Sequence, residues 1–289
     1  MTLKLRYKIC EKDANKSLKN FLKKQDLSRK AITTLKHQGG KICINAEEKT
    51  TRFMLTVGDV VTITFPDEPV SNTLLPFKMD MENVYEDDFL LVVDKKEGLT
   101  SVPSGFYSTS LANGILAYYE DIGLKSTVHF VNRLDKGTSG LLVVAKHRHI
   151  HHLMTVDAKS VKRKYYALIS GILKDFGCVD APIARLSADS VKRSVHPSGK
   201  RAITNYEAIE HFEDSTLVRC TLETGRTHQI RVHMDHLGHP ILKDPLYGDG
   251  ECGDKQLLHS YFLEFVHPIT RDIMSFETEV PNRFGQFMG

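Results

Sequence analysis

The stretch VNRLDKGTSGLLVVAK, residues 131–146, joins a polar loop to an apolar run and decides how the chain is read. Asp135 stands between Arg133 and Lys136, and the run GLLVVAK that follows predicts a buried β-strand. A strand can hold such a carboxylate rigidly while its oxygens face a cleft, and catalytic residues concentrate in loops of this kind. The alternative is a surface turn whose aspartate binds local backbone amides. Asp135 is therefore the first candidate catalytic residue.

The composition indicates a globular chain. With 289 residues, 41% of them hydrophobic, the chain can bury a substantial core in one large domain or two unequal ones. No apolar run is long enough for a membrane span, and MTLKLRYKICEKD at the N-terminus lacks a signal-peptide core, so a cytoplasmic protein is expected. Five scattered cysteines without CxxC spacing predict reduced thiols: Cys10, Cys43, Cys178, Cys220 and Cys252.

The net charge of +3 hides an asymmetry along the chain. Residues 1–66 hold 14 Lys and Arg against six Asp and Glu, whereas the remainder holds 25 against 30. A basic module joined to an acidic body favours a polyanion-binding appendage. A solvated basic face remains the alternative.

The basic module has the pattern of two helices followed by strands. Leu18, Phe21 and Leu22 form an apolar helical stripe, and Ser28 is a plausible N-cap for a second helix that ends at Gly39-Gly40. Strands are expected at 41–45 and 60–65. A helix pair with a basic face can lie along a phosphate backbone. The basic residues on these helices are Lys16, Lys19, Lys23, Arg29, Lys30 and Lys36.

The body beyond the proline-rich segment 66–77 predicts a mixed α+β sheet. A Gly-rich phosphate loop and regular βα alternation are both absent, which argues against a Rossmann or P-loop fold. Helices are expected at 111–119 and 147–159. Strands are expected at 89–95, 140–146, 164–171, 216–222 and 230–234.

Two further segments could meet Asp135 in space. In VKRKYYALISG, alternation allows only one of Tyr165 and Tyr166 to face a cleft, where it could stack on a nucleobase. Ordinary strand aromatics are the alternative for this pair.

The second segment is LETGRTHQIRVHMDHLGHP, residues 222–240, the densest polar run in the chain. If 230–234 is a strand, Arg231 and His233 share one face, and an arginine there could pair with a buried carboxylate and keep it ionised. The histidine spacing matches no metal-ligand pattern, so no metal site is predicted.

The basic module, with DLSRKAITTLKHQGGKICIN and VGDVVTI, resembles the S4 RNA-binding domain over most of residues 13–65. Across nearly the whole chain, five blocks stand in the order found in RluA/RluD-type pseudouridine synthases. They are LLVVDKKEGL, NRLDKGTSGLLVVAK, KRKYYALISG, LETGRTHQIRVHMDHLGHPILKDPLYG and LHSYFLEFVHPIT. The resemblance implies an S4-like domain at 1–70, a linker at 71–79 and a catalytic domain with a mixed, largely antiparallel central sheet at 80–289.

The resemblance also implies an RNA pseudouridine synthase, an isomerase that converts uridine to pseudouridine in structured RNA. Ribosomal RNA of the large subunit (23S) is the favoured substrate and transfer RNA is a further candidate. Asp135 would start the reaction by attacking the nucleoside or by drawing on the sugar. Tyr165 would stack on the base, Arg231 would be the basic partner of Asp135, and Arg133 would take the place of the flipped base.

Contacts to the rest of the RNA would come from Lys19, Lys23, Arg29, Lys30, Lys36, Arg226 and His228. The reaction has no redox or group-transfer step, so no cofactor and no metal are expected. A monomer is the expected state.

The sequence departs from the family pattern at three places. Asn132 stands where the family often has His, Lys95-Lys96-Glu97-Gly98 where it has KPxG, and Lys243 where it often has Gly. Two alternatives stay open. One is a catalytically silent RNA-binding or ribosome-assembly protein, and the other is a carboxylate-dependent glycosidase, which normally needs two acidic residues.

Overall fold

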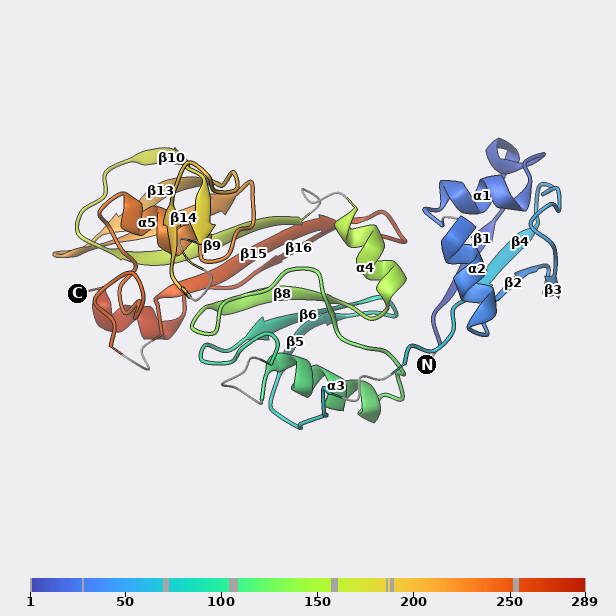
Figure 1. The fold of residues 1–289 in the computed structure, drawn as a ribbon, viewed down its shortest axis with the longest axis horizontal. Coiled ribbons are helices and arrows are strands. Elements are labelled where there is room, and N and C mark those ends of the chain that lie inside the picture. The colour runs from blue at the N-terminus through green and yellow to red at the C-terminus, as the bar shows by residue number, and fades with distance from the viewer. Residues whose placement is uncertain are drawn as a thin grey trace.

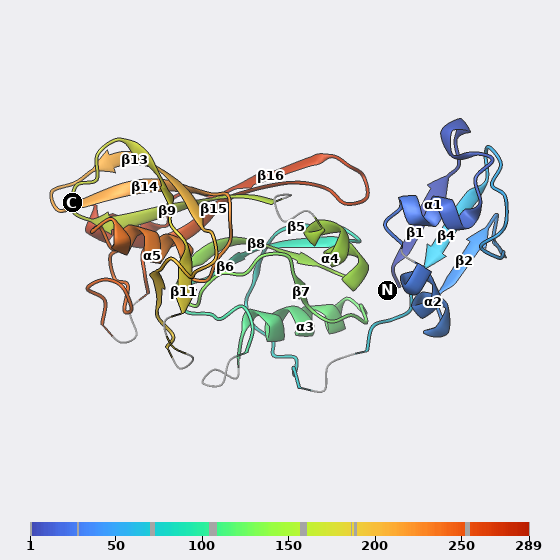
Figure 2. The ribbon, with the colours of Figure 1, turned by 45° about the horizontal axis from the view of Figure 1, so that its top comes forward.

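The computed structural model describes residues 2–27, 29–69, 73–103, 109–156, 161–185, 187, 190–251 and 255–288. They form a small N-terminal unit and a larger body, each built on its own β-sheet, with the N-terminal unit at one end of the molecule (Figures 1 and 2). None of the helices in these ranges is both long and apolar enough to cross a membrane.

The N-terminal unit is an antiparallel sheet with two helices packed against it. In spatial order, the strands are β1 (Lys4–Lys8), β4 (Val60–Thr64), β2 (Lys41–Ile44) and β3 (Glu47–Glu48). The helices are α1 (Leu18–Lys24) and α2 (Arg29–His37), preceded by a 3-10 turn at Glu11–Asp13. The predicted stripe of Leu18, Phe21 and Leu22 is buried, as expected for helices that rest on a sheet. The proposed cap, Ser28, lies outside the described residues.

Two residues at the end of the N-terminal unit join it to the body. Phe65 stacks on His149 of helix α4 (Arg148–Thr155), with ring centroids 4.9 Å apart. Glu68 is 4% exposed, accepts a hydrogen bond from the Arg148 backbone N–H at 2.7 Å and lies 2.6 Å from His129 Nε2. The basic unit is therefore anchored beside α4 (Figure 1).

The body contains one long sheet whose neighbours are mostly antiparallel. Its path runs β10 (Phe176–Asp180), β13 (Ile203–His211), β14 (Ser215–Leu222), β9 (Val161–Ser170), β15 (Leu258–Val266), β8 (Ser139–Ala145), β6 (Leu90–Lys95) and β5 (Glu82–Glu86). Off this path, β16 (Ile273–Glu277) pairs with β15 and β7 (His129–Phe130) with β8, while β11 (Ile183–Arg185) and β12 (Arg193–Val195) form a separate hairpin. A 3-10 segment, Asn282–Phe287, follows β16.

The pairing of β15 with β8 is parallel and joins the two halves of the sheet. Gly140 pairs with Ser260 at this seam and has φ of +109°. A Cβ at Gly140 would lie 2.3 Å from the Ser260 carbonyl oxygen, so only glycine allows this close approach. The seam lies directly after the Asp135 loop, which places that loop at the middle of the sheet.

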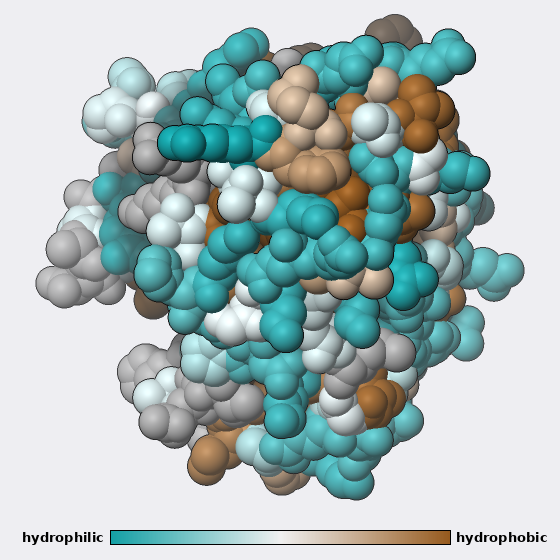
Figure 3. All heavy atoms as spheres, turned by 90° about the vertical axis from the view of Figure 1, so that its right-hand side faces the viewer, coloured by the Kyte–Doolittle hydropathy of each residue, from teal (hydrophilic) through white to brown (hydrophobic). Residues whose placement is uncertain are grey.

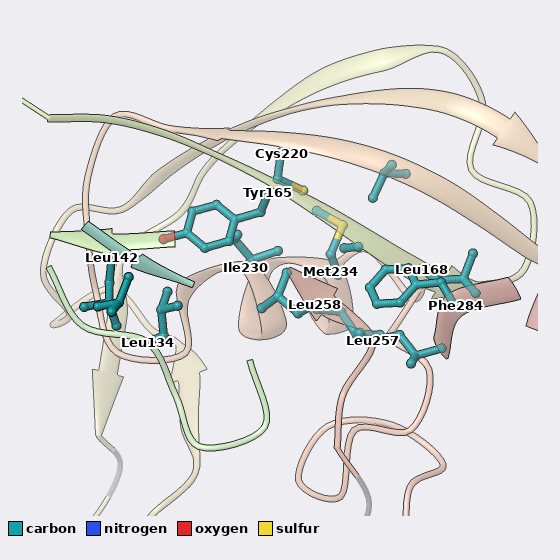
Figure 4. Close-up of a cluster of buried hydrophobic side chains, with 14 of the residues drawn as sticks. Leu134, Leu142, Tyr165, Leu168, Cys220, Ile230, Met234, Leu257, Leu258 and Phe284 are labelled. Atoms are coloured by element: carbon teal, nitrogen blue, oxygen red, sulfur yellow. The ribbon is translucent and has the colours of Figure 1, made fainter. Parts of the chain in front are cut away.

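Helices cover both faces of the sheet, which explains the continuous apolar runs of β6 and β8. Leu91 and Leu142 pack in one cluster with α3 (Leu111–Asp121) and α5 (Gln229–His236), whereas Leu90 and Leu141 pack in another with α4. Alternate residues of each strand thus point to opposite faces. Figure 4 shows the first cluster, in which Tyr165 lies close to Leu134, Leu142 and Ile230.

The mixed, largely antiparallel sheet confirms the predicted α+β class, but one predicted strand is wrong. Residues 230–234 belong to helix α5. Five residues do not separate a period of 2 from one of 3.6, and here Ile230 and Met234 share a helix face toward the Tyr165 cluster while Val232 faces another. The other predicted elements are present within three residues of the expected bounds, except that 157–159 of the fourth helix fall outside the described residues.

Candidate active site

Asp135 lies in the loop between β7 and β8, and both of its neighbours are held by their backbone. Ser101 donates to the Leu134 carbonyl at 2.8 Å and accepts from the Leu134 N–H at 3.2 Å. The Gly98 N–H donates to the Lys136 carbonyl at 2.8 Å. The Asp135 side chain keeps 29% of its surface exposed, so the loop presents a fixed but accessible carboxylate.

The buried side chain of Lys95 also supports the Asp135 loop. Its ammonium group donates to the carbonyls of Lys96 at 2.9 Å and Leu99 at 2.8 Å, and more distantly to that of Lys136 at 3.4 Å. The residue is only 1% exposed, and burial lowers the pKa of Lys95 to about 7 although the nearby Asp135 charge opposes this shift. Lys95 thus holds backbone carbonyls of two neighbouring loops, 96–99 and the Asp135 loop.

Helix α5 brings Arg231 to Asp135, so the expected pairing is present although Arg231 was expected on a strand. Arg231 Nη1 donates to Asp135 Oδ2 at 3.1 Å, across 96 residues of chain. The rest of the guanidinium binds Asp244, with Nε–Oδ2 at 2.7 Å and Nη2–Oδ1 at 2.8 Å. Burial by itself lowers the pKa of Arg231, but the hydrogen bonds to Asp244 and Asp135 outweigh it and hold the pKa above its usual value. The arginine therefore stays charged and fixed beside the candidate carboxylate.

Asp244 is a member of the site that sequence reasoning missed. It is fully buried, and its Oδ1 also accepts from the backbone N–H groups of Leu246 at 2.9 Å and Tyr247 at 3.2 Å. The Tyr247 ring lies 5.1 Å from the Arg231 guanidinium carbon. In the sequence, the only signal was that Asp244 and Tyr247 both stand in the block GHPILKDPLYG.

His228 lies closer to the acid than its predicted role as an RNA contact suggested. It precedes α5 with φ of +58°, and its Nε2 is 3.9 Å from Asp135 Oδ2. Its Nδ1 is 3.0 Å from the Tyr247 hydroxyl. Burial lowers the pKa of His228 despite the Asp135 charge, so the ring is neutral at neutral pH.

The two adjacent tyrosines diverge as alternation predicted. Tyr165 lines the Asp135 pocket and is 6% exposed, and burial raises the pKa of its phenol, so it stays protonated at neutral pH. Tyr166 stacks on Tyr261, with ring centroids 3.9 Å apart, and does not line this pocket. Only Tyr165 can therefore meet a base that enters the pocket.

The Asp135 pocket has a volume of about 60 Å³ and a strongly basic rim. Among its described lining residues, Asp135 is the sole carboxylate, and Arg133 and Arg226 are exposed. The complete lining is Arg133, Leu134, Asp135, Thr138, Tyr165, Leu222, Arg226, His228, Gln229, Ile230, Arg231 and Leu258. The site thus combines one carboxylate with the positively charged side chains of Arg133, Arg226 and Arg231, which suit a polyanionic substrate.

Of the basic residues predicted on the N-terminal helices, those with described side chains do not line this pocket. Lys19 and Lys23 are exposed on α1, and Lys36 lies 3.6 Å from Glu48. The side chains of Arg29 and Lys30 lie outside the described ones. Figure 3 looks onto the end of the molecule that carries this unit and shows a mostly hydrophilic surface with smaller hydrophobic patches.

The three departures from the family pattern have structural contexts. Asn132 is buried and its Oδ1 accepts from the Val143 N–H at 2.8 Å, which ties the loop to β8. Lys96 is exposed and pairs with Asp80 at 2.8 Å. Lys243 has φ of +58°, a left-handed conformation that favours glycine. None of the three displaces Asp135, Tyr165 or Arg231.

Within the described parts of the chain, no group of three or more His, Cys, Asp or Glu side chains is arranged to hold a metal ion. The histidines of 147–152 lie at α4, where His147 Nε2 is 3.5 Å from Glu68. Burial lowers the pKa of both His147 and His149 to about 4. The rings of His147 and His149 are therefore neutral at neutral pH, and they pack between the N-terminal unit and the body.

Comparisons with known proteins agree with this geometry. A family model described as RNA pseudouridylate synthase matches residues 89–236. The chain is 41% identical over 271 residues to "Uncharacterized RNA pseudouridine synthase YjbO" of Bacillus subtilis, covering 92% of this chain and 95% of that protein. It is 39% identical over 224 residues to "Ribosomal large subunit pseudouridine synthase D" of Pseudomonas aeruginosa, covering 71% of this chain and 70% of that protein.

Solved structures share the fold. "Human RNA Pseudouridylate Synthase Domain Containing 1" is similar with a TM-score of 0.59 and 24% identity, over 77% of this chain and 89% of that chain. "Human RNA Pseudouridylate Synthase Domain Containing 4" gives a TM-score of 0.58 at 22% identity, over 71% and 90% of the two chains.

Proposed function

Because the chain belongs to the RNA pseudouridylate synthase family, we propose that it isomerises uridine to pseudouridine in large-subunit ribosomal RNA, with Asp135 as the catalytic carboxylate. The observation that carries this assignment is the 3.1 Å pair of Arg231 and Asp135 in a pocket that Tyr165 also lines. The ribosomal substrate is supported by the name of the Pseudomonas aeruginosa relative.

The geometry suits a carboxylate that acts on a nucleoside. Arg231 binds Asp135 Oδ2, while Oδ1 accepts no hydrogen bond from the described residues, so Oδ1 is the oxygen available to react. A carboxylate can serve as a covalent nucleophile. The reaction breaks the bond between N1 of uracil and C1′ of ribose, turns the base, and joins C5 to the same C1′. The proton lost from C5 is balanced by the proton gained at N1.

Tyr165 and Arg133 would handle the extruded base. A uridine must leave its stack to reach Asp135, at a cost of a few kcal/mol. The Tyr165 ring can stack on the uracil in the pocket, and its phenol is protonated and able to donate. Arg133, exposed at the rim, can occupy the space that the base leaves in the RNA.

The N-terminal unit, residues 1–70, would bind RNA as an S4-like domain, joined through the linker 71–79 to the catalytic domain at 80–289. Its support is the excess of basic residues and the exposed Lys19 and Lys23. Arg226 and His228 would contact RNA at the active site. A ribosomal substrate would be met in the cytoplasm, and a monomer is supported by the described lining of the Asp135 pocket, which comes from one chain.

Among the described residues of the Asp135 pocket, the glycosidase alternative finds no second acid. Asp244, the other carboxylate at Arg231, is fully buried and saturated by that arginine and two backbone N–H groups. Release of free uracil from RNA would nevertheless favour this alternative. A silent RNA-binding protein would leave the RNA unchanged.

The decisive experiment maps pseudouridines across ribosomal and transfer RNA from cells with and without this protein. Loss of one or a few sites in large-subunit ribosomal RNA is the expected result, and restoration by the wild-type chain but not by Asp135→Asn would assign the acid. Loss only in transfer RNA would overturn the ribosomal substrate. An unchanged map, or full restoration by Asp135→Asn, would overturn the catalytic proposal.

The role of the N-terminal unit needs its own test in the full chain. The double variant Lys19→Gln/Lys23→Gln should bind RNA more weakly, with a shallower salt dependence, because two phosphate contacts are lost. Lys49→Gln is the matched control in the same unit, since Lys49 already pairs with Glu47 at 2.5 Å. Equal salt slopes for the double variant and the control would contradict the RNA-binding role.

A further inference from the structure

A second basic pocket adjoins the Asp135 pocket. It has a volume of about 380 Å³ and is formed by the β11–β12 hairpin, the segment 198–200 and the turn at 226–227. Four of its lining residues are cationic, Arg185, Arg193, Lys200 and Arg226, and none of the described ones is acidic. We call it the hairpin pocket. Its charge alone makes it a candidate for an anionic ligand.

The strand register places two of these cations opposite each other. Arg185 pairs directly with Arg193 in the antiparallel β11–β12 hairpin. Side chains in such a pair have Cβ atoms about 5 Å apart, and like charges there are destabilising. The register therefore brings two guanidinium groups from adjacent strands to the same pocket, where one anion could bind both.

The backbone holds the other cations in place. Lys200 exchanges two hydrogen bonds of 2.9 Å with Ile183 of β11. Gly199 permits this approach, because a Cβ there would lie 2.5 Å from the Ile183 carbonyl carbon. Arg226 Nε donates to the Arg201 carbonyl at 3.0 Å, which fixes the guanidinium at the edge of the pocket.

The hairpin pocket is physically continuous with the catalytic pair. Arg226 lines both pockets. The Arg193 N–H donates to the Tyr247 hydroxyl at 2.7 Å, and the Tyr247 ring lies against Arg231. An anion in the hairpin pocket is thus next to the entrance of the Asp135 pocket.

We propose that the hairpin pocket is a phosphate-binding subsite, which holds a backbone phosphodiester of the RNA strand close to the target uridine. This inference rests on the proposed function. Extrusion of a uridine requires its flanking backbone to be held while the base moves, and phosphate contacts fix the register of a strand without reading its sequence. Exposed arginines suit this task because the guanidinium fork matches phosphate oxygens.

The test removes two cations that lie outside the catalytic pair. Arg185→Gln, Lys200→Gln and the double variant are compared with the wild type for binding of a labelled single-stranded oligouridylate at several salt concentrations. Each lost contact should reduce the salt slope by about 0.7 and weaken binding about fourfold at about 0.15 M salt. Lys78→Gln is the charge-matched control, because Lys78 is exposed and already pairs with Asp121 at 2.8 Å, away from the pocket.

A chemical variant of the ligand makes the test independent of folding. Uncharged methylphosphonate linkages, introduced one at a time beside one uridine, should weaken wild-type binding at one position and have little further effect on the double variant. A double variant with the wild-type salt slope, or with the full methylphosphonate penalty, overturns the subsite.

The result separates this inference from the proposed function. A wild-type protein that binds RNA but makes no pseudouridine would overturn the proposed function, whereas the salt slopes would still decide on the subsite. Active variants with unchanged RNA binding would overturn the subsite alone.

Discussion

Arg231 and Asp244 form a buried two-point ion pair, with Nε–Oδ2 at 2.7 Å and Nη2–Oδ1 at 2.8 Å, and this pair aims the third guanidinium nitrogen at Asp135. Arg231 is 4% exposed and Asp244 is fully buried. Two parallel hydrogen bonds fix the plane of a guanidinium as a single bond cannot. The position of Arg231 relative to Asp135 therefore depends on a residue outside the pocket.

Asp244→Asn should reduce both stability and activity. Breaking a buried ion pair leaves an uncompensated charge and costs about 3–5 kcal/mol, so denaturant unfolding should show a large loss. The double variant Arg231→Met/Asp244→Leu should recover most of that stability, because an apolar pair of similar volume replaces the charges. It should not recover pseudouridine formation. Recovery of activity in the double variant would show that the arginine has no catalytic role.

Lys243→Gly should stabilise the protein. Lys243 has φ of +58°, which costs a non-glycine residue about 1–2 kcal/mol, so glycine should relieve this strain. The greater freedom of glycine in the unfolded chain offsets part of the stability that is gained. The expected rise is roughly 0.5–1 kcal/mol, or about 1–3 °C in Tm by calorimetry. Lys243→Ala keeps the strained backbone and should show no gain. A lower Tm for Lys243→Gly would mean that side-chain contacts, such as that with Phe287 at 5.6 Å, dominate.

Lys95 should make stability depend on pH on the alkaline side. Its pKa falls from 10.5 to about 7 on folding, so between these values the unfolded chain binds more protons and stability rises with pH. Relative to Lys95→Met, the wild type should gain up to about 1.4 kcal/mol per pH unit over this range. Urea unfolding at several pH values measures the difference. The exposed neighbour Lys96→Met is the control, and a flat difference for Lys95→Met would show that Lys95 is charged in the folded state.

Glu68 should make the junction between the N-terminal unit and the body sensitive to acid. Burial alone would raise the pKa of Glu68, but hydrogen bonds from His129 and the Arg148 backbone hold it well below 4.5. A depressed carboxyl pKa contributes stability above pH 4.5 that is lost as pH falls toward the folded value. Wild type should therefore lose stability below pH 4.5 faster than Glu68→Gln does in thermal unfolding. Glu11→Gln, at an exposed carboxylate of the N-terminal unit, should leave the wild-type profile unchanged, and parallel profiles for wild type and Glu68→Gln would refute the prediction.

Several parts of the site were predictable because they depend on short-range patterns. The apolar run after Asp135 predicts a strand buried on both faces, and β8 packs helices on each side. Strand alternation separates Tyr165 from Tyr166 without any knowledge of the fold. The pairing of Arg231 with Asp135 was also expected. The argument for it assumed that Arg231 lies on a strand, and this was wrong because Arg231 belongs to helix α5.

The sequence by itself determined the acid at the loop–strand junction, the rule that only one of Tyr165 and Tyr166 can face the cleft, and the basic character of the first 66 residues. Only the tertiary structure decided that Asp244 holds Arg231, that Lys95 supports the Asp135 loop and that Arg185 meets Arg193 beside the pocket. Local periodicity reports which face a residue occupies within its own element. Which residues meet across distant elements depends on strand order, register and burial, and these are set by packing of the whole chain.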